Sequence, residues 1–206
     1  MMEALELIRK HFWEVTVLYL CITAGELFLS QSMNRWWIIP LFNITLVPLG
    51  ILDYYYKRLF NGLVAVMGLM GLVICGLLPE RHPGDVLIGA AVFGGVLFLI
   101  RYMSKESLGM GDVKLGAAAG IWLGPQASVT ALYASFAIGG LYVVFYLLMM
   151  VMKDGVDSLW KYRKKAIPFG PFLAIGSSVG LIYGEEIIGM YLTLLCWTGA
   201  PVLWRL

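Results

Sequence analysis

Long apolar runs, separated by short breaks that contain charges, glycine or proline, make up almost all of this chain of 206 residues. A helix needs about 20 mostly apolar residues to cross a bilayer, with a range of about 17–25. The pattern predicts eight membrane-spanning helices, at 13–30, 36–52, 61–79, 84–102, 107–124, 126–152, 167–184 and 186–204. The fifth is rich in Gly and Ala, which let helices approach closely, so we expect it inside the bundle.

The composition supports the same architecture. Hydrophobic residues make up 60% of the chain and charged residues 14%, with a mean hydropathy of +0.82, whereas a soluble domain is about 45–50% apolar and about 25% charged. The pattern contains no repeat and no long linker. We therefore expect residues 1–206 to form a single all-α domain, a polytopic helix bundle with the lipid bilayer as its solvent.

Several partners are disfavoured. Cys21, Cys75 and Cys196 are isolated within apolar runs, a pattern that gives neither a metal site nor a disulfide framework. No basic stretch is interleaved with aromatic residues as a nucleic-acid groove requires. We expect no metal, no cofactor and no nucleic-acid partner.

The positive charges predict the orientation. With eight spans and both termini in the cytoplasm, thirteen of the 15 Lys and Arg residues fall on the cytoplasmic side, and Arg35 and Arg81 fall outside. Cytoplasmic loops are usually rich in Lys and Arg, so this asymmetry favours both the span count and the orientation. The basic loop 153–166 is the longest cytoplasmic one and can contact anionic lipid headgroups.

Three of the acidic residues within or beside the spans call for an explanation. We expect Glu26, near the outer end of the first span, to reach polar headgroups. Asp53 closes the second span and Asp112 lies a third of the way into the fifth. The chain crosses the membrane and returns between these two aspartates, so both belong to one membrane face. Ionisable groups at membrane depth are costly and tend to be functional.

Two nearby carboxyl groups suit an aspartyl protease, in which the ionised one activates a water and the protonated one polarises the scissile carbonyl. Gly109 and Gly111 remove side-chain bulk just before Asp112, so a substrate backbone can approach there. Lys114 points to another helix face, where it either snorkels to the headgroups or biases protonation of the pair. The residues alone leave two other interpretations open, a helix-packing glycine pair beside an interfacial Asp and a proton or cation relay in a transporter subunit.

Three stretches carry a family resemblance. Gly109-Met110-Gly111-Asp112-Val113-Lys114-Leu115 resembles the GxGD-x-K-L signature of the type IV prepilin peptidases, a family of intramembrane aspartyl proteases. Asp53 to Asn61 resembles the family's first-aspartate segment, although Phe60 stands where relatives commonly have proline. Ile167-Pro168-Phe169-Gly170-Pro171-Phe172-Leu173 resembles its late IPFGP(F/A)L motif.

The resemblance implies a multi-pass enzyme of the bacterial plasma membrane that removes the short leader of prepilin-like or pseudopilin substrates at the cytoplasmic face, usually after a glycine and before an apolar stalk helix. It implies Asp53 and Asp112 as the catalytic pair, with Gly109, Gly111, Lys114, Pro168, Gly170 and Pro171 in support. Many relatives also methylate the new amino terminus and have a four-cysteine zinc-binding insertion; residues 31–43 contain no cysteine, so we expect peptidase activity alone. A presenilin-like GxGD protease is the second choice, because Leu52-Asp53 replaces its usual Tyr-Asp.

Overall fold

The structure is a computed structural model that describes residues 6, 9–29, 36–78, 81–104, 108–154 and 168–197. These residues contain six helices of substantial length and no strand, which confirms the all-α prediction. The helices are α2 (Phe12–Leu29), α3 (Ile38–Tyr56), α4 (Asn61–Leu77), α5 (Pro83–Met103), α6 (Met110–Asp154) and α8 (Gly170–Trp197). Five of them are long and apolar enough to cross a membrane, and α4, with 17 residues, is at the short end of that range.

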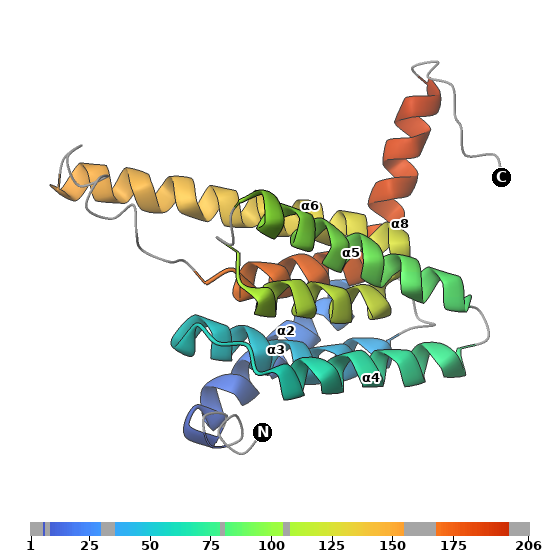
Figure 1. The fold of residues 1–206 in the computed structure, drawn as a ribbon, viewed down its shortest axis with the longest axis horizontal. Coiled ribbons are helices and arrows are strands. Elements are labelled where there is room, and N and C mark those ends of the chain that lie inside the picture. Colours follow the sequence, from blue (N-terminus) through green and yellow to red (C-terminus); the bar gives the residue numbers. More distant parts are fainter. Residues whose placement is uncertain are drawn as a thin grey trace.

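The helix α6 contains two of the predicted spans, 107–124 and 126–152, and its direction reverses between them (Figure 1). Gly124 stands at the reversal with φ 74° and ψ −178°, a conformation outside the helical region that glycine adopts without a steric penalty. Pro125 follows, and proline disfavours a helical residue before it while fitting the first turn of the next helix. The predicted break between these two spans therefore exists, as a reversal without an intervening loop.

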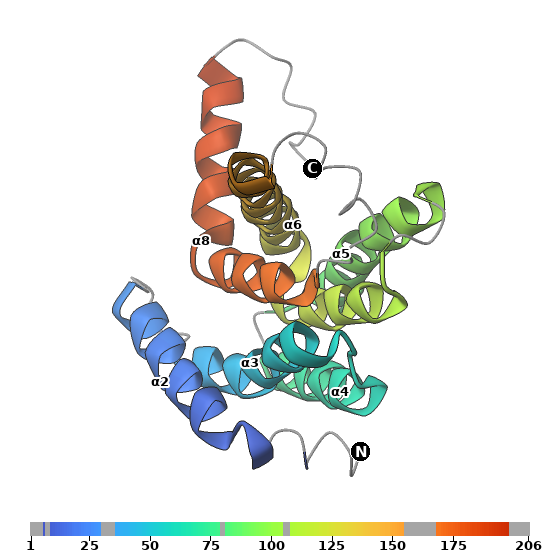
Figure 2. The same cartoon turned by 90° about the vertical axis from the view of Figure 1, so that its left-hand side faces the viewer.

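The helix α8 replaces the predicted pair of spans at 167–184 and 186–204. It runs without a break from Gly170 to Trp197, and its last part, red in Figures 1 and 2, turns away from the bundle across the direction of the other helices. The eight-span count is therefore not confirmed. Residues 155–166 of the basic loop and both chain ends lie outside the described residues, so the placement of the termini stays a prediction.

The first half of α6 lies inside the bundle, as its composition predicts. Leu115, Ala119 and Trp122 are at most 1% exposed, and the indole Nε1 of Trp122 donates a hydrogen bond to the Met67 carbonyl oxygen at 2.9 Å. A Cβ atom on Gly120 would lie 2.3 Å from the carbonyl oxygen of Gly89 in α5. Such contact leaves no room for a side chain and fixes how α6 crosses its neighbour.

Candidate active site

Asp53 lies in the last turn of α3. The helix continues one turn beyond the predicted end at residue 52, to Tyr56, so the aspartate is part of the helix and only 7% exposed. Lys57 ends the helix in a left-handed conformation, with φ 51°, and its N–H donates to the Asp53 carbonyl oxygen at 2.9 Å. The chain therefore leaves the helix one turn after Asp53, which places the carboxyl group at the end of the bundle.

Gly170, the first residue of α8, holds the Asp53 carboxyl group. Its backbone N–H donates to Asp53 Oδ2 at 2.8 Å, and a Cβ atom at this position would lie 2.5 Å from that oxygen. Pro171 fits here because residues in the first helical turn have no partner for their N–H groups. Pro168 is half-buried just before the helix, and none of the hydrogen bonds described in this region involves it. The close contact with Asp53 thus explains why the IPFGP segment has a glycine at position 170.

Asp112 lies in the first turn of α6 and is also 7% exposed. Its N–H donates to the Gly109 carbonyl oxygen at 3.2 Å, and its Oδ2 lies 3.0 Å from the place that a Cβ on Gly109 would take. A Cβ on Gly111 would meet the Cβ of Leu59 at 2.8 Å. The two glycines therefore give space to different neighbours, Gly109 to the carboxyl group and Gly111 to the connection between α3 and α4.

The two carboxyl groups lie at the same end of the bundle, near enough for their charges to interact. Asp53 accepts a hydrogen bond from the N-terminus of α8, and Asp112 belongs to the first turn of α6. A helix N-terminus carries a partial positive charge of about half an elementary charge, which stabilises an anion. Asp112 Oδ1 is buried and has no hydrogen-bond partner among the described residues. The arrangement can hold one negative charge and present an unused oxygen to a reacting water or amide.

Lys114 lies apart from both carboxyl groups. Its exposed side chain donates from Nζ to Asn61 Oδ1 at 2.9 Å and so joins α6 to the start of α4. The hydrogen bond gives this lysine a structural partner outside the acid pair. Leu59 and Asn61 were not predicted to matter; only their place in the first-aspartate segment marks them.

Glu26 differs from its prediction. It is 5% exposed instead of reaching the headgroups, and its Oε2 accepts a hydrogen bond from Asn43 Nδ2 at 2.8 Å. The second oxygen, Oε1, is buried without a hydrogen-bond partner among the described residues. The prediction of an interfacial role is wrong because Asn43, on the neighbouring helix α3, offers a donor inside the bundle.

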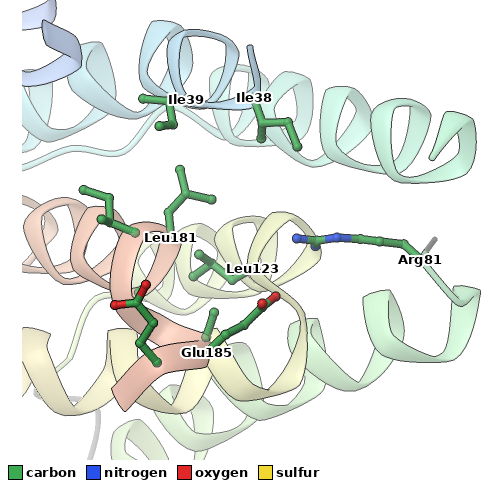
Figure 3. A pocket seen from close by; sticks show the side chains of 10 residues that line it. Ile38, Ile39, Arg81, Leu123, Leu181 and Glu185 are labelled. Atoms are coloured by element: carbon green, nitrogen blue, oxygen red, sulfur yellow. The ribbon is translucent and has the colours of Figure 1, made fainter. Parts of the chain in front are cut away.

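A hollow lies at the end of the bundle opposite the acid pair (Figure 3). Its lining includes Ile38, Arg81, Leu123 and Glu185, and the side chains of Arg81 and Glu185 point into it. Ile38 begins α3, about 22 Å along the helix from Asp53. The guanidinium of Arg81 donates to the Trp122 carbonyl oxygen beside the reversal of α6. This hollow of about 120 Å³ therefore lies away from Asp53 and does not extend the acid site.

The fold and the site together define a multi-pass helical membrane protein with a buried pair of aspartates at one end of its bundle. Residues 40–144 match the model of the type IV leader peptidase family. The chain belongs to that family, which confirms the resemblance found in its motifs.

Named relatives give the same assignment. The prepilin leader peptidase/N-methyltransferase of Aeromonas salmonicida is 30% identical over 182 residues, 86% of this chain and 57% of that protein. The Aeromonas hydrophila protein of the same name is 36% identical over 115 residues, 53% and 37% of the two chains. The Legionella pneumophila protein of the same name is 31% identical over 157 residues, which are 71% of this chain and 50% of that protein. The chain thus spans about half the length of the curated relatives it matches. No solved structure matches it.

Proposed function

We propose that this chain is an aspartic endopeptidase of the bacterial inner membrane, which cleaves the leader of a prepilin-like or pseudopilin substrate at the cytoplasmic face. The observation that supports this most is that two buried carboxyl groups, Asp53 and Asp112, lie at the N-termini of α8 and α6, near enough for their charges to interact. Family membership favours this substrate class over that of a presenilin-like protease. The predicted charge asymmetry supports the cytoplasmic side.

In the proposed reaction the acid pair shares one proton, because two adjacent negative charges repel each other. The ionised carboxyl group takes a proton from a water molecule, whose oxygen attacks the carbonyl carbon of the scissile amide. The protonated carboxyl group donates to the carbonyl oxygen as negative charge develops there. The first carboxyl group then gives its proton to the leaving amine as the C–N bond breaks, and the second takes its proton back from the former carbonyl oxygen, so the pair again shares one proton. The N-terminal ends of α6 and α8 stabilise the charge throughout.

The test is the replacement of each aspartate by asparagine in protein purified in detergent, with a prepilin substrate that is followed by mass spectrometry. We expect Asp53→Asn and Asp112→Asn each to reduce kcat by about 10²–10⁴-fold, the usual contribution of a general acid or base. Asp85→Asn is the matched control, because Asp85 also lies in the first turn of a helix, α5, but at the far end.

The outcomes are distinct. If either aspartate variant cleaves at the wild-type rate while Asp85→Asn does too, the acid-pair mechanism is wrong. Ion flux through a preparation that never cleaves would favour the proton or cation relay instead. The same spectra report methylation of the mature amino terminus, and we expect an unmodified amine there. An added methyl group would show that this chain shares the second activity in its relatives' name.

A further inference from the structure

A long apolar groove runs beside the acid pair, between α2, α3 and α8. Its volume is about 510 Å³, and its lining includes Leu18 and Ile22 of α2, Gly50 of α3, and Pro171 and Ile175 of α8. Gly50 lies one helical turn before Asp53, and Pro171 directly follows Gly170. One end of the groove is therefore lined by residues next to Asp53 and to Gly170, which holds its carboxyl group. Figure 2 shows α2, α3 and α8 as neighbouring helices, with α2 on the outer side of α3.

The dimensions of the groove suit one face of a helix. Its lining on α8 extends from Pro171 to Tyr183, twelve residues further along the chain or about 18 Å of helix. A helix of that length and about 10 Å diameter occupies about 1400 Å³. The groove, with a volume of about 510 Å³, therefore has room for roughly a third of such a helix. The rest of such a helix would face lipid. A membrane-embedded apolar helix fits the groove in this way without leaving the bilayer.

A buried carboxyl group interrupts the mostly apolar lining, which also includes Glu14 and Ser178. Glu26 lines the groove and is only 5% exposed, and its Oε1 has no hydrogen-bond partner among the described residues. The hydroxyl of Ser178 lies near this carboxyl group and also lines the groove. Asn43, which donates to the other oxygen of Glu26, precedes Asp53 by ten residues, about 15 Å along α3. A carboxyl group with an unused oxygen at this depth points to a ligand that brings a polar group of its own.

We propose that the groove between α2, α3 and α8 receives the apolar helix that follows the scissile bond of the substrate, and that Glu26 forms a hydrogen bond with a polar side chain about ten residues beyond that bond. A helix that starts at the acid pair and runs along α3 brings its tenth residue level with Glu26. A bare acyl chain fills the same space but leaves Glu26 Oε1 unsatisfied. The inference rests on the proposed function, because it needs the acid pair to be the point of cleavage.

Two substrates separate this inference from the proposed function. One is a full-length prepilin, and the other is a short peptide that ends a few residues after the scissile bond. Ile175→Trp fills the groove, because Ile175 lines it and is 47% exposed. Ile187→Trp is the matched control on the same helix, 43% exposed and outside the groove lining. We expect Ile175→Trp to raise KM for the full-length substrate about 5- to 100-fold, the range for overpacking a filled site, with kcat/KM for the peptide unchanged.

Glu26 is tested with the same pair of substrates. Glu26→Leu removes the hydrogen bond, and we expect kcat/KM for the full-length substrate to fall about 3- to 30-fold, as for hydrogen bonds between membrane helices. Glu26→Gln keeps a polar group of the same shape and should retain most of the activity. A photo-crosslinking residue placed about ten positions after the scissile bond should label α2 or α8 beside Glu26.

Three results decide between the possibilities. Equal KM values for Ile175→Trp, Ile187→Trp and wild type with the full-length substrate would overturn the groove assignment, even if cleavage is normal, and would leave lipid as the occupant. Crosslinks to the exposed face of α5 alone would overturn it too. If the wild-type chain cleaves neither substrate, the proposed function has failed instead.

Discussion

Replacing Gly170 by alanine adds one methyl group where the start of α8 meets Asp53. The new Cβ would lie 2.5 Å from Asp53 Oδ2 and 2.8 Å from its Cβ and Cγ. Ordinary van der Waals contact begins at 3.4 Å, so the two groups must separate by about 0.9 Å, the difference between 3.4 and 2.5 Å. The Asp53 Cβ is attached to the backbone of α3, so rotation of the side chain alone cannot make this room.

The same displacement breaks the hydrogen bond that holds the carboxyl group. The distance from Gly170 N to Asp53 Oδ2 grows from 2.8 Å to about 3.7 Å, beyond the range of a hydrogen bond. A misplacement of about 1 Å in a catalytic group can cost about 10²-fold in rate. We therefore expect Gly170→Ala to lower kcat about 100-fold. Gly170 has no positive φ, so the loss comes from the contact and not from backbone strain.

The assay is prepilin cleavage in detergent, with circular dichroism and thermal unfolding of each variant in parallel. Gly62→Ala is the matched control, because Gly62 also lies in the first turn of a helix at this end of the bundle and a Cβ there meets nothing within 4 Å. It should cleave like wild type. Cleavage by Gly170→Ala within a few-fold of the Gly62→Ala rate would refute the reasoning, since the acid pair would then not depend on the position of Asp53.

Three further substitutions test the fold around the site. Gly124→Ala forces a methyl group into a backbone conformation with φ 74°, and we expect a loss of about 1–3 kcal/mol in unfolding free energy; an unchanged midpoint of denaturant unfolding would contradict the reversal in α6. Lys114→Gln removes an exposed hydrogen bond to Asn61 and should change cleavage less than about tenfold, whereas a loss as large as that of Asp112→Asn would give the lysine a direct role. Asp53→Ala removes the acceptor for the first N–H of α8 and should lower stability by about 1 kcal/mol, while Asp53→Asn, which retains an acceptor oxygen, should not.

The helices could be predicted from the apolar pattern because each span is a local property of the chain. The break at Gly124-Pro125 was equally visible, since both residues act through their own backbone. The predicted division at residue 185 does not end a helix, because Glu is a good helix former; α8 instead continues and changes direction in its last part (Figure 1). Polarity marks where a helix leaves lipid, but it does not mark where its hydrogen bonds stop.

The contacts of the site were less accessible from the sequence. The motifs indicated Asp53 and Asp112, but nothing near Gly170 reveals that its missing side chain makes room for a carboxyl group 117 residues earlier. Glu26 was misplaced for the same reason, because its partner Asn43 lies 17 residues away on another helix. Apolar periodicity says which face of a helix is buried. Which polar groups meet across helices is set by packing.

The helix ends explain how an acid pair can ionise in an apolar bundle. A single charge at membrane depth is costly, yet α6 and α8 both begin at the site and each N-terminus contributes about half a positive charge. Their sum is about one elementary charge, which matches one shared proton and one negative charge on Asp53 and Asp112. The N-terminus of α8 needs such an acceptor, because Phe169 precedes Gly170 and has no capping side chain. Asp53 therefore caps a helix far along the chain with the same carboxyl group that serves the proposed chemistry.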